Sequence, residues 1–221
     1  MMQPQIHCLH WPNVDPKIVK AHKETCEHFG MNVNYTCETI EHGLWMDNIM
    51  MSSIAEAKLF IEIDCVPTNK EIVDKAISFA LNNKSMVGIA QVSNHIAPYS
   101  HIYAAPAFFA IHRDIWDDMG RPSFCTNENC DTAENVSYAA EIYKVKYKTL
   151  YPTHYFKDPE GGAWNLHTYG KYGIGTHFEG GVFHLYQGRM LQNAELFHNI
   201  CKGIRNKTFD YNNMLPCRTP L

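Results

Sequence analysis

Two carboxylates interrupt the most apolar stretch of this 221-residue chain, residues 59–67. Glu62 and Asp64 stand at positions i and i+2, a spacing that puts both side chains on one face of a β-strand. The surrounding Leu, Phe and Ile are typical of a strand covered on both sides, and Pro67 cannot donate to a ladder, so the strand should end there. We therefore expect both carboxylates near the carboxyl end of an interior strand, where open α/β sheets bind their ligands.

A pair of carboxylates at that place suits a divalent cation, because Mg²⁺ and Mn²⁺ prefer oxygen ligands. The alternative is an acidic pair that Lys or Arg neutralises, or that lies on an exposed rim. The position of Glu62 and Asp64 at the end of a buried strand favours the metal interpretation.

The elements that must position these residues follow from apolar periodicity and helix-start signals. The first part of the chain predicts strand 6–10, a helix from Asp15-Pro16 to Gly30, strand 33–39, helix 42–53 and strand 59–67. A β-α-β-α-β opening implies right-handed crossovers and a parallel sheet. Further elements are predicted over 68–83, where Thr68 and Glu71 form a capping box, and over 86–92, 101–111, 113–119, 131–143, 147–151, 181–186 and 190–205, with an irregular tail. We expect one α/β domain over 1–221, with a mainly parallel central sheet flanked by helices.

Composition excludes some classes of protein. The formal charge of −4 and pI of about 6.3 argue against a general nucleic-acid binder, which needs a dominant basic face. No apolar stretch reaches the roughly 18 residues of a membrane span, and no signal peptide is evident, so a cytoplasmic location is expected. The eight scattered cysteines fit reduced thiols better than a disulfide framework.

The order of these parts resembles the GT-A class of nucleotide-sugar-dependent glycosyltransferases, and most of all the small single-domain enzymes of large DNA viruses and phages. The stretches that carry the resemblance are His10-Trp11-Pro12, residues 60–67, 103–109, 131–134 and 181–184. The class carries Asp-x-Asp at the end of the central strand, so Asp64 matches and Glu62 is a departure. A late histidine often completes the metal site of the class, and His184 stands at that position. From the residues alone, His184 could equally be a half-buried structural histidine, with His177 or His167 as competing ligands.

The resemblance also implies roles for other residues. Asp131 matches an acidic residue beneath the acceptor hydroxyl, and with Glu134 it is the catalytic candidate; the same pair also reads as a helix-capping box. Candidates for binding the donor lie after the first strand and in the helix before the metal strand: His10, Trp11, Asn13, His42 and Trp45. Lys171 and Arg189, which have glycine neighbours, are candidates for the diphosphate.

The predicted function is metal-dependent transfer of a hexose from a nucleotide sugar, such as UDP-glucose, to a glycan or protein acceptor, with Mn²⁺ or Mg²⁺ as cofactor. Retention of anomeric configuration is favoured, because the acidic candidate for a base is equally explained as a cap. A nucleotidyltransferase is an alternative, although residues 10–15 lack the Gly-rich basic loop expected of one. A non-catalytic carbohydrate-binding module is another. The Gly- and aromatic-rich residues 161–180 are expected to close over the donor.

Overall fold

The computed structural model describes residues 3–93, 101–156, 163–186, 191–210 and 214–217. Its helices are α1 (Pro16–His28), α2 (His42–Ser52), α3 (Lys70–Asn83), α4 (Arg113–Asp118), α5 (Glu134–Ile142), α6 (Leu191–Arg205) and the 3-10 turn η1 (His167–Tyr169). Its longer strands are β1 (Gln5–His10), β2 (Val33–Cys37), β3 (Ala57–Ile61), β5 (Met86–Val92) and β6 (Ile102–His112). The shorter strands are β4 (Cys65–Pro67), β7 (Lys148–Leu150), β8 (Pro152–Tyr155), β9 (Ala163–Asn165), β10 (Lys171–Gly173), β11 (Thr176–Phe178), β12 (Val182–His184) and β13 (Leu215–Pro216).

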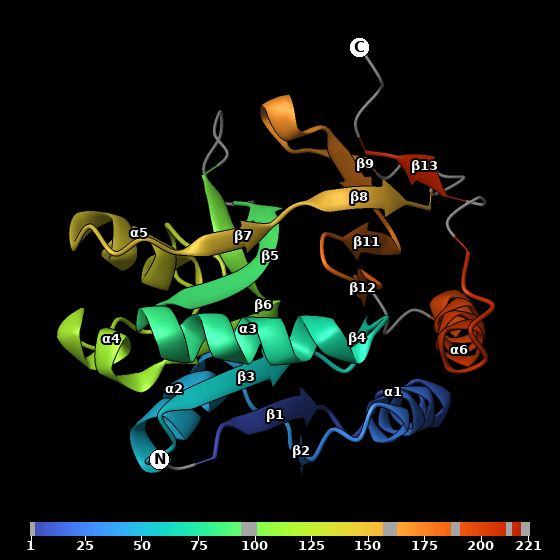
Figure 1. Ribbon diagram of the computed structural model, residues 1–221, viewed down its shortest axis with the longest axis horizontal. Helices are drawn as coiled ribbons and strands as arrows, with labels where there is room; N and C mark the ends of the chain where they lie inside the picture. The colour runs from blue at the N-terminus through green and yellow to red at the C-terminus, as the bar shows by residue number, and fades with distance from the viewer. Residues whose placement is uncertain (1–2, 94–100, 157–162, 187–190, 211–213, 218–221) are drawn as a thin grey trace.

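A six-stranded sheet in the order β2-β1-β3-β6-β5-β7 forms the centre of the molecule (Figure 1). β1 runs parallel to both β2 and β3, and β7 runs parallel to β5. Only β6 is reversed within this sheet, because it pairs antiparallel with β3 and β5. β5 ends at Val92 and β6 starts at Ile102, a connection too short for a parallel crossover. The predicted α/β class with a mainly parallel sheet and flanking helices is confirmed.

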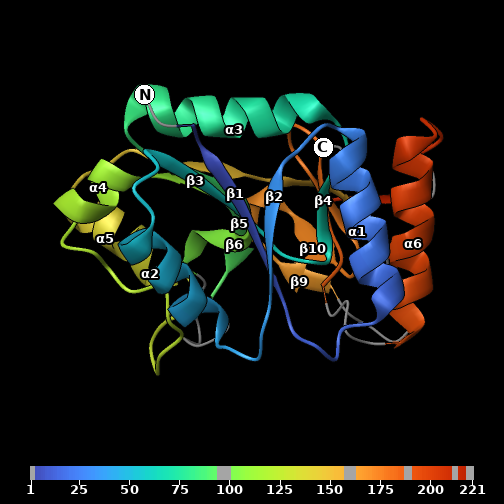
Figure 2. The ribbon, with the colours of Figure 1, turned by 90° about the horizontal axis from the view of Figure 1, so that it is seen from below.

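The alternation of β3 explains why its residues 59–61 are apolar without interruption. Leu59 and Ile61 join the cluster that contains the inner face of α3, whereas Phe60 points to the other side and packs with Trp45 of α2. Figure 2 shows α3 along one side of the sheet and α2 on the other. Every residue of β3 is buried, as expected for a strand covered on both sides.

The expected strand over 59–67 is wrong in one respect that matters for the site. β3 ends at Ile61, and the next three residues form a turn in which the Cys65 N–H donates to the Glu62 carbonyl at 3.0 Å. The chain then enters β4, which belongs to a second, five-stranded sheet in the order β13-β8-β11-β12-β4. Glu62 and Asp64 therefore lie in a turn between two sheets, not on one face of a strand. The prediction missed this turn because a continuous apolar run does not reveal that its two halves belong to different sheets.

Residues 163–180 are folded structure and not the open loop that was expected. β9 and β10 form a hairpin in which Trp164 pairs with Tyr172, and β11 is an inner strand of the second sheet. Tyr172 is only 2% exposed and packs in a cluster with Val92. Gly161 and Gly162 lie outside the described residues. The tail also differs from the expectation, because β13 pairs with β8.

Helix boundaries follow local chemistry, with two corrections. Asp15 caps α1 as predicted, its carboxylate accepting from the Lys17 N–H. The cap of α3 is Asn69 and not the predicted capping box of Thr68, because the Asn69 side chain accepts from the Ile72 N–H. The cap of α5 is Ala133 and not Asp131.

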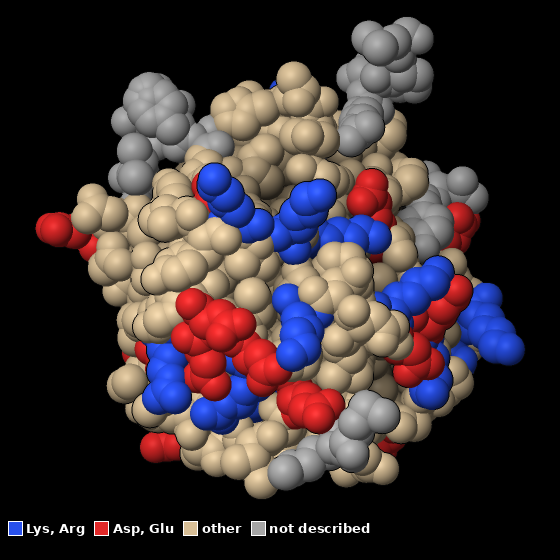
Figure 3. All heavy atoms as spheres, turned by 60° about the vertical axis from the view of Figure 1, so that its left-hand side comes forward, with Lys and Arg blue, Asp and Glu red and all other residues tan. Residues whose placement is uncertain are grey.

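The outer surface is mixed in charge where it is seen. The face in Figure 3 carries Lys and Arg side chains next to Asp and Glu side chains, with neither sign dominant. The last helix, α6, packs beside the first helix, α1 (Figure 2). Among the described residues, no helix combines the length and the apolar character that crossing a membrane requires.

Candidate metal centre and cleft

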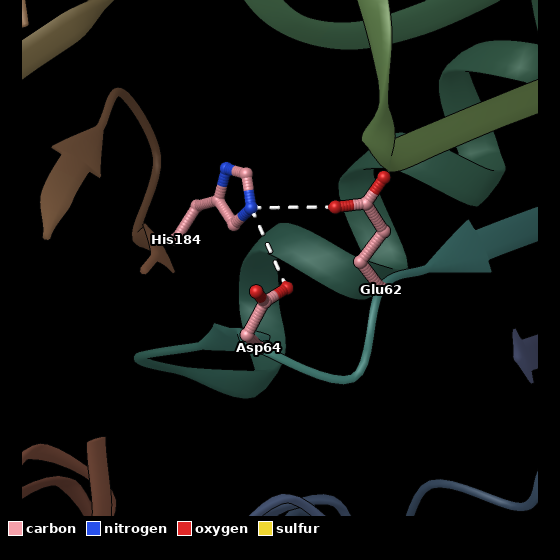
Figure 4. Close-up of side chains that lie close together, drawn as sticks. All are labelled: Glu62, Asp64 and His184. Carbon is pink, nitrogen blue, oxygen red and sulfur yellow. Dashed lines mark ion pairs between the residues drawn. The ribbon is translucent and has the colours of Figure 1, made fainter. Parts of the chain in front are cut away.

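The second sheet carries His184 to the turn that holds Glu62 and Asp64. β12 runs antiparallel to β4 with His184 opposite Cys65, and the Leu185 N–H donates to the Asp64 carbonyl at 2.9 Å. Figure 4 shows the three side chains pointing toward one another. His184 Nε2 lies 3.3 Å from Glu62 Oε2 and 3.5 Å from Asp64 Oδ1. One donor atom from each residue falls within 4.8 Å of the others, so the group could hold a metal ion.

Electrostatics bind these three side chains together. Burial of His184, which is 4% exposed, lowers the pKa of its imidazole, but the hydrogen bonds and charges of Asp64 and Glu62 outweigh burial and raise that pKa to about 9. Burial would raise the pKa of Glu62, yet the contacts with His184 and His42 hold it well below its usual range. Two carboxylates and one imidazole fit a divalent transition-metal ion that accepts mixed oxygen and nitrogen ligands. His184 Nδ1 finds no hydrogen-bond partner among the described residues.

A second histidine orients Glu62 from outside the group. His42 is the first residue of α2, and its Nδ1 lies 3.2 Å from Glu62 Oε1. Its ring stacks on the indole of Trp45 with 5.6 Å between centroids, and the Trp45 Nε1–H donates to Thr36 Oγ1 at 3.2 Å. Each oxygen of Glu62 thus has its own imidazole. Trp45 itself is 3% exposed and supports His42 from the core, and its place in the donor pocket stays a prediction.

We expect the substitution His42→Asn to weaken Mn²⁺ binding roughly tenfold, because partners that orient a metal ligand commonly contribute 10- to 100-fold to affinity. Calorimetric titration of Mn²⁺ without nucleotide measures this. His28, exposed at the end of α1, provides the matched control His28→Asn. An unchanged affinity in His42→Asn would show that Glu62 needs no such support.

A cleft of about 220 Å³ opens beside the metal group. Its lining residues are Glu62, Asp64, Gln91, Tyr103, Pro106, Asp131, Thr132, His184 and Tyr186. The structure therefore brings the three metal candidates and the predicted catalytic Asp131 to one cavity from three separate parts of the chain. Asp131 is also not the helix cap that competed with this role, because α5 has Ala133 at its N-cap and no side-chain cap hydrogen bond.

The other predicted residues that the structure describes do not line this cavity. Glu134 is fully buried, with an exposure of 0%, and lies outside the lining. His10 is the last residue of β1, and Trp11 and Asn13 follow it. Trp11 is 44% exposed and its Nε1–H donates to the Ile40 carbonyl at 2.9 Å. Lys171 is exposed on β10 and is not a lining residue. Arg189 lies outside the described residues.

Five lining residues were not predicted: Gln91, Tyr103, Pro106, Thr132 and Tyr186. Tyr103 lies in a stretch that carries the resemblance to the GT-A class, and Tyr186 follows His184 by two residues. Closeness in sequence to these motifs is therefore the signal that could have identified both tyrosines. The Tyr186 hydroxyl is buried without a hydrogen-bond partner among the described residues, and its ring lies 4.2 Å from that of His184.

Comparisons with known proteins give only distant likenesses. No protein-family model matches the sequence, and no curated protein matches it. A197 from STIV is 11% identical with a TM-score of 0.44, over 66% of this chain and 80% of that one. CMP:2-keto-3-deoxy-manno-octonic acid synthetase complexed with CTP is 10% identical with a TM-score of 0.41, over 68% of this chain and 90% of that one. A glycosyltransferase involved in the glycosylation of the major capsid of PBCV-1 is 20% identical with a TM-score of 0.31, over 52% of this chain and 63% of that one. At such scores, none of them assigns a family or an activity to this chain.

Proposed function

We propose that this protein is a divalent-cation-dependent glycosyltransferase that moves a hexose from a UDP-sugar to a hydroxyl group of a glycan or glycoprotein. The observation that carries the proposal is the convergence of Glu62, Asp64 and His184 on one cleft together with Asp131. A metal group that shares a cavity with a separate carboxylate suits transfer of a sugar away from a charged leaving group.

In this proposal Glu62, Asp64 and His184 would hold the cation, for which Mn²⁺ is our first choice because two of the three ligands are carboxylates and the third is an imidazole. When bound, the cation would neutralise charge that develops on the departing diphosphate. The amide of Gln91 and the hydroxyl of Thr132 would hydrogen-bond to sugar hydroxyls. Asp131 would accept a hydrogen bond from the acceptor hydroxyl and orient its oxygen toward the anomeric carbon.

The stereochemical outcome depends on Asp131. An inverting reaction needs a base to take the proton of the acceptor hydroxyl, and Asp131 is the lining carboxylate outside the metal group. The sequence favoured retention because Asp131 was equally explained as a helix cap. Since Ala133 occupies that cap, the argument for retention no longer applies, and the anomer of the product becomes a direct test of the role of Asp131.

A screen of nucleotide sugars tests the proposed function. We expect slow release of UDP from at least one UDP-hexose in the presence of Mn²⁺ and none in EDTA, with water replacing the acceptor. NMR of the released sugar gives the anomer. Release of pyrophosphate from a nucleoside triphosphate and a sugar phosphate would instead indicate a nucleotidyltransferase. Saccharide binding with no turnover of any donor would indicate a carbohydrate-binding module.

A further inference from the structure

Glu134 is a buried carboxylate that lies outside the cleft. It is the first residue of α5 and its side chain is 0% exposed. Burying a carboxylate costs free energy unless charged or hydrogen-bonding groups surround it. Its Oε1 lies 3.0 Å from His101 Nδ1, and its Oε2 accepts the Asp131 N–H at 2.8 Å. Glu134 therefore connects an imidazole on one side to the backbone of a cleft residue on the other.

His101 is itself held from its far side. Its Nε2 lies 2.8 Å from Oε1 of Glu141, the second-last residue of α5, and the Tyr147 hydroxyl donates to the same oxygen at 2.9 Å. The ring stacks on Tyr138 with centroids 3.9 Å apart and planes 15° apart. Burial lowers the pKa of His101, but the two carboxylates outweigh it and raise that pKa above its ordinary value. A protonated ring can donate from both nitrogens at once, so His101 bridges the two glutamates.

The segment that Glu134 holds is a strained turn. Ala133 has a φ of +67°, in the left-handed region that residues with a side chain rarely adopt. The Ala133 N–H donates to the Phe124 carbonyl at 2.9 Å, while the Asp131 N–H is taken by Glu134. Strain of this kind persists only where surrounding contacts fix the backbone. The two residues before Ala133 in this turn, Asp131 and Thr132, both line the cleft.

We propose that Glu134 is a positioning residue, which fixes the turn at 131–133 so that Asp131 and Thr132 face the cleft, and that His101, held by Glu141, fixes Glu134 in turn. The role of Asp131 in turnover rests on the proposed function, whereas the fixing of the turn does not. Glu134, predicted from the sequence to be catalytic, therefore acts through Asp131.

The substitution Glu134→Gln tests the proposal with little change in volume. The glutamine side chain has one oxygen and one NH₂ group, so it can accept from His101 or from the Asp131 N–H but not from both. The other hydrogen bond is lost, because the NH₂ group faces a second donor there. We expect hydrogen exchange at the amides of residues 131–134 to become roughly tenfold faster, and kcat for donor turnover to fall roughly tenfold, as for other supporting partners of a functional group. The affinity for UDP with Mn²⁺ should change less than about twofold, because the metal group lies on other elements. Glu128→Gln is the matched control, since Glu128 is an exposed carboxylate on the same loop.

His101→Gln provides a second variant in case Glu134→Gln does not fold, and it should produce the same local changes. If wild-type protein turns over no donor, the proposed function fails, but faster exchange confined to 131–134 still supports the fixing of the turn. Exchange and kcat equal to those of Glu128→Gln in the folded variants would overturn the proposal. So would uniformly faster exchange across α5 and β6, because that pattern indicates a general structural role.

Discussion

The substitution Asp64→Asn is expected to lower the affinity for UDP in the presence of Mn²⁺ at least roughly 100-fold, equivalent to about 2.7 kcal/mol. The Asp64 carboxylate lies 3.5 Å from His184 Nε2 and belongs to the metal group, and an uncharged amide of the same shape is a much poorer ligand. The shape is conserved, so the folded state should persist. Calorimetry with UDP, in Mn²⁺ and in EDTA, measures the change.

The matched control is Asp74→Asn. Asp74 is an exposed carboxylate on α3 that pairs with Lys70 at 3.3 Å, and such exposed pairs contribute little. We expect Asp74→Asn to bind UDP as the wild type does. Wild-type protein that binds UDP equally well in EDTA and in Mn²⁺ would rule out the metal interpretation of Asp64, whatever the variants do.

The first half of the fold could be predicted because its signals are local. The Asp15-Pro16 pair marks the start of α1, and apolar periodicity marks both α1 and α2. The second sheet could not be predicted in the same way. β4 and β12 have only three residues each and fall inside the predicted strands 59–67 and 181–186, but no local pattern shows that they pair with each other across more than 100 residues. β11, which lies between Gly175 and Gly180, instead resembled part of a loop.

The same distinction separates the parts of the site. Glu62 and Asp64 stand out because carboxylates are unusual inside an apolar run, even though they lie in a turn and not on a strand. The three-residue spacing of Asp131 and Glu134 suggested one shared role, but the structure separates them into a cleft residue and a buried support. The contact of His42 with Glu62 depends on how α2 packs against the end of β3, which no local pattern encodes.

The pairing of His184 with two carboxylates predicts that binding of the cation depends on pH. Without a cation, the raised pKa of about 9 keeps the imidazole protonated at neutral pH, and the ring must lose this proton to coordinate a metal. The affinity for Mn²⁺ should therefore rise about tenfold for each pH unit between pH 6 and pH 8, with about one proton released per ion. Calorimetry in two buffers with different ionisation enthalpies counts the protons.

The sign for folding stability is opposite in the cation-free protein. The folded pKa of His184, about 9, lies above its ordinary value of 6.5, so the stabilisation from its ion pairs is complete below pH 6.5 and is lost as pH rises through 9. Mn²⁺ should therefore raise the melting temperature more at pH 8 than at pH 6, because it replaces a proton that is held less firmly there.

In His184→Ala the steep pH dependence of Mn²⁺ affinity should disappear together with most of the affinity. A wild-type affinity that is flat from pH 6 to pH 8 would show that the imidazole does not exchange its proton for the cation. A His184→Ala protein that binds normally but melts at a much lower temperature would identify His184 as a core residue, since coordination and packing predict opposite outcomes for these two measurements.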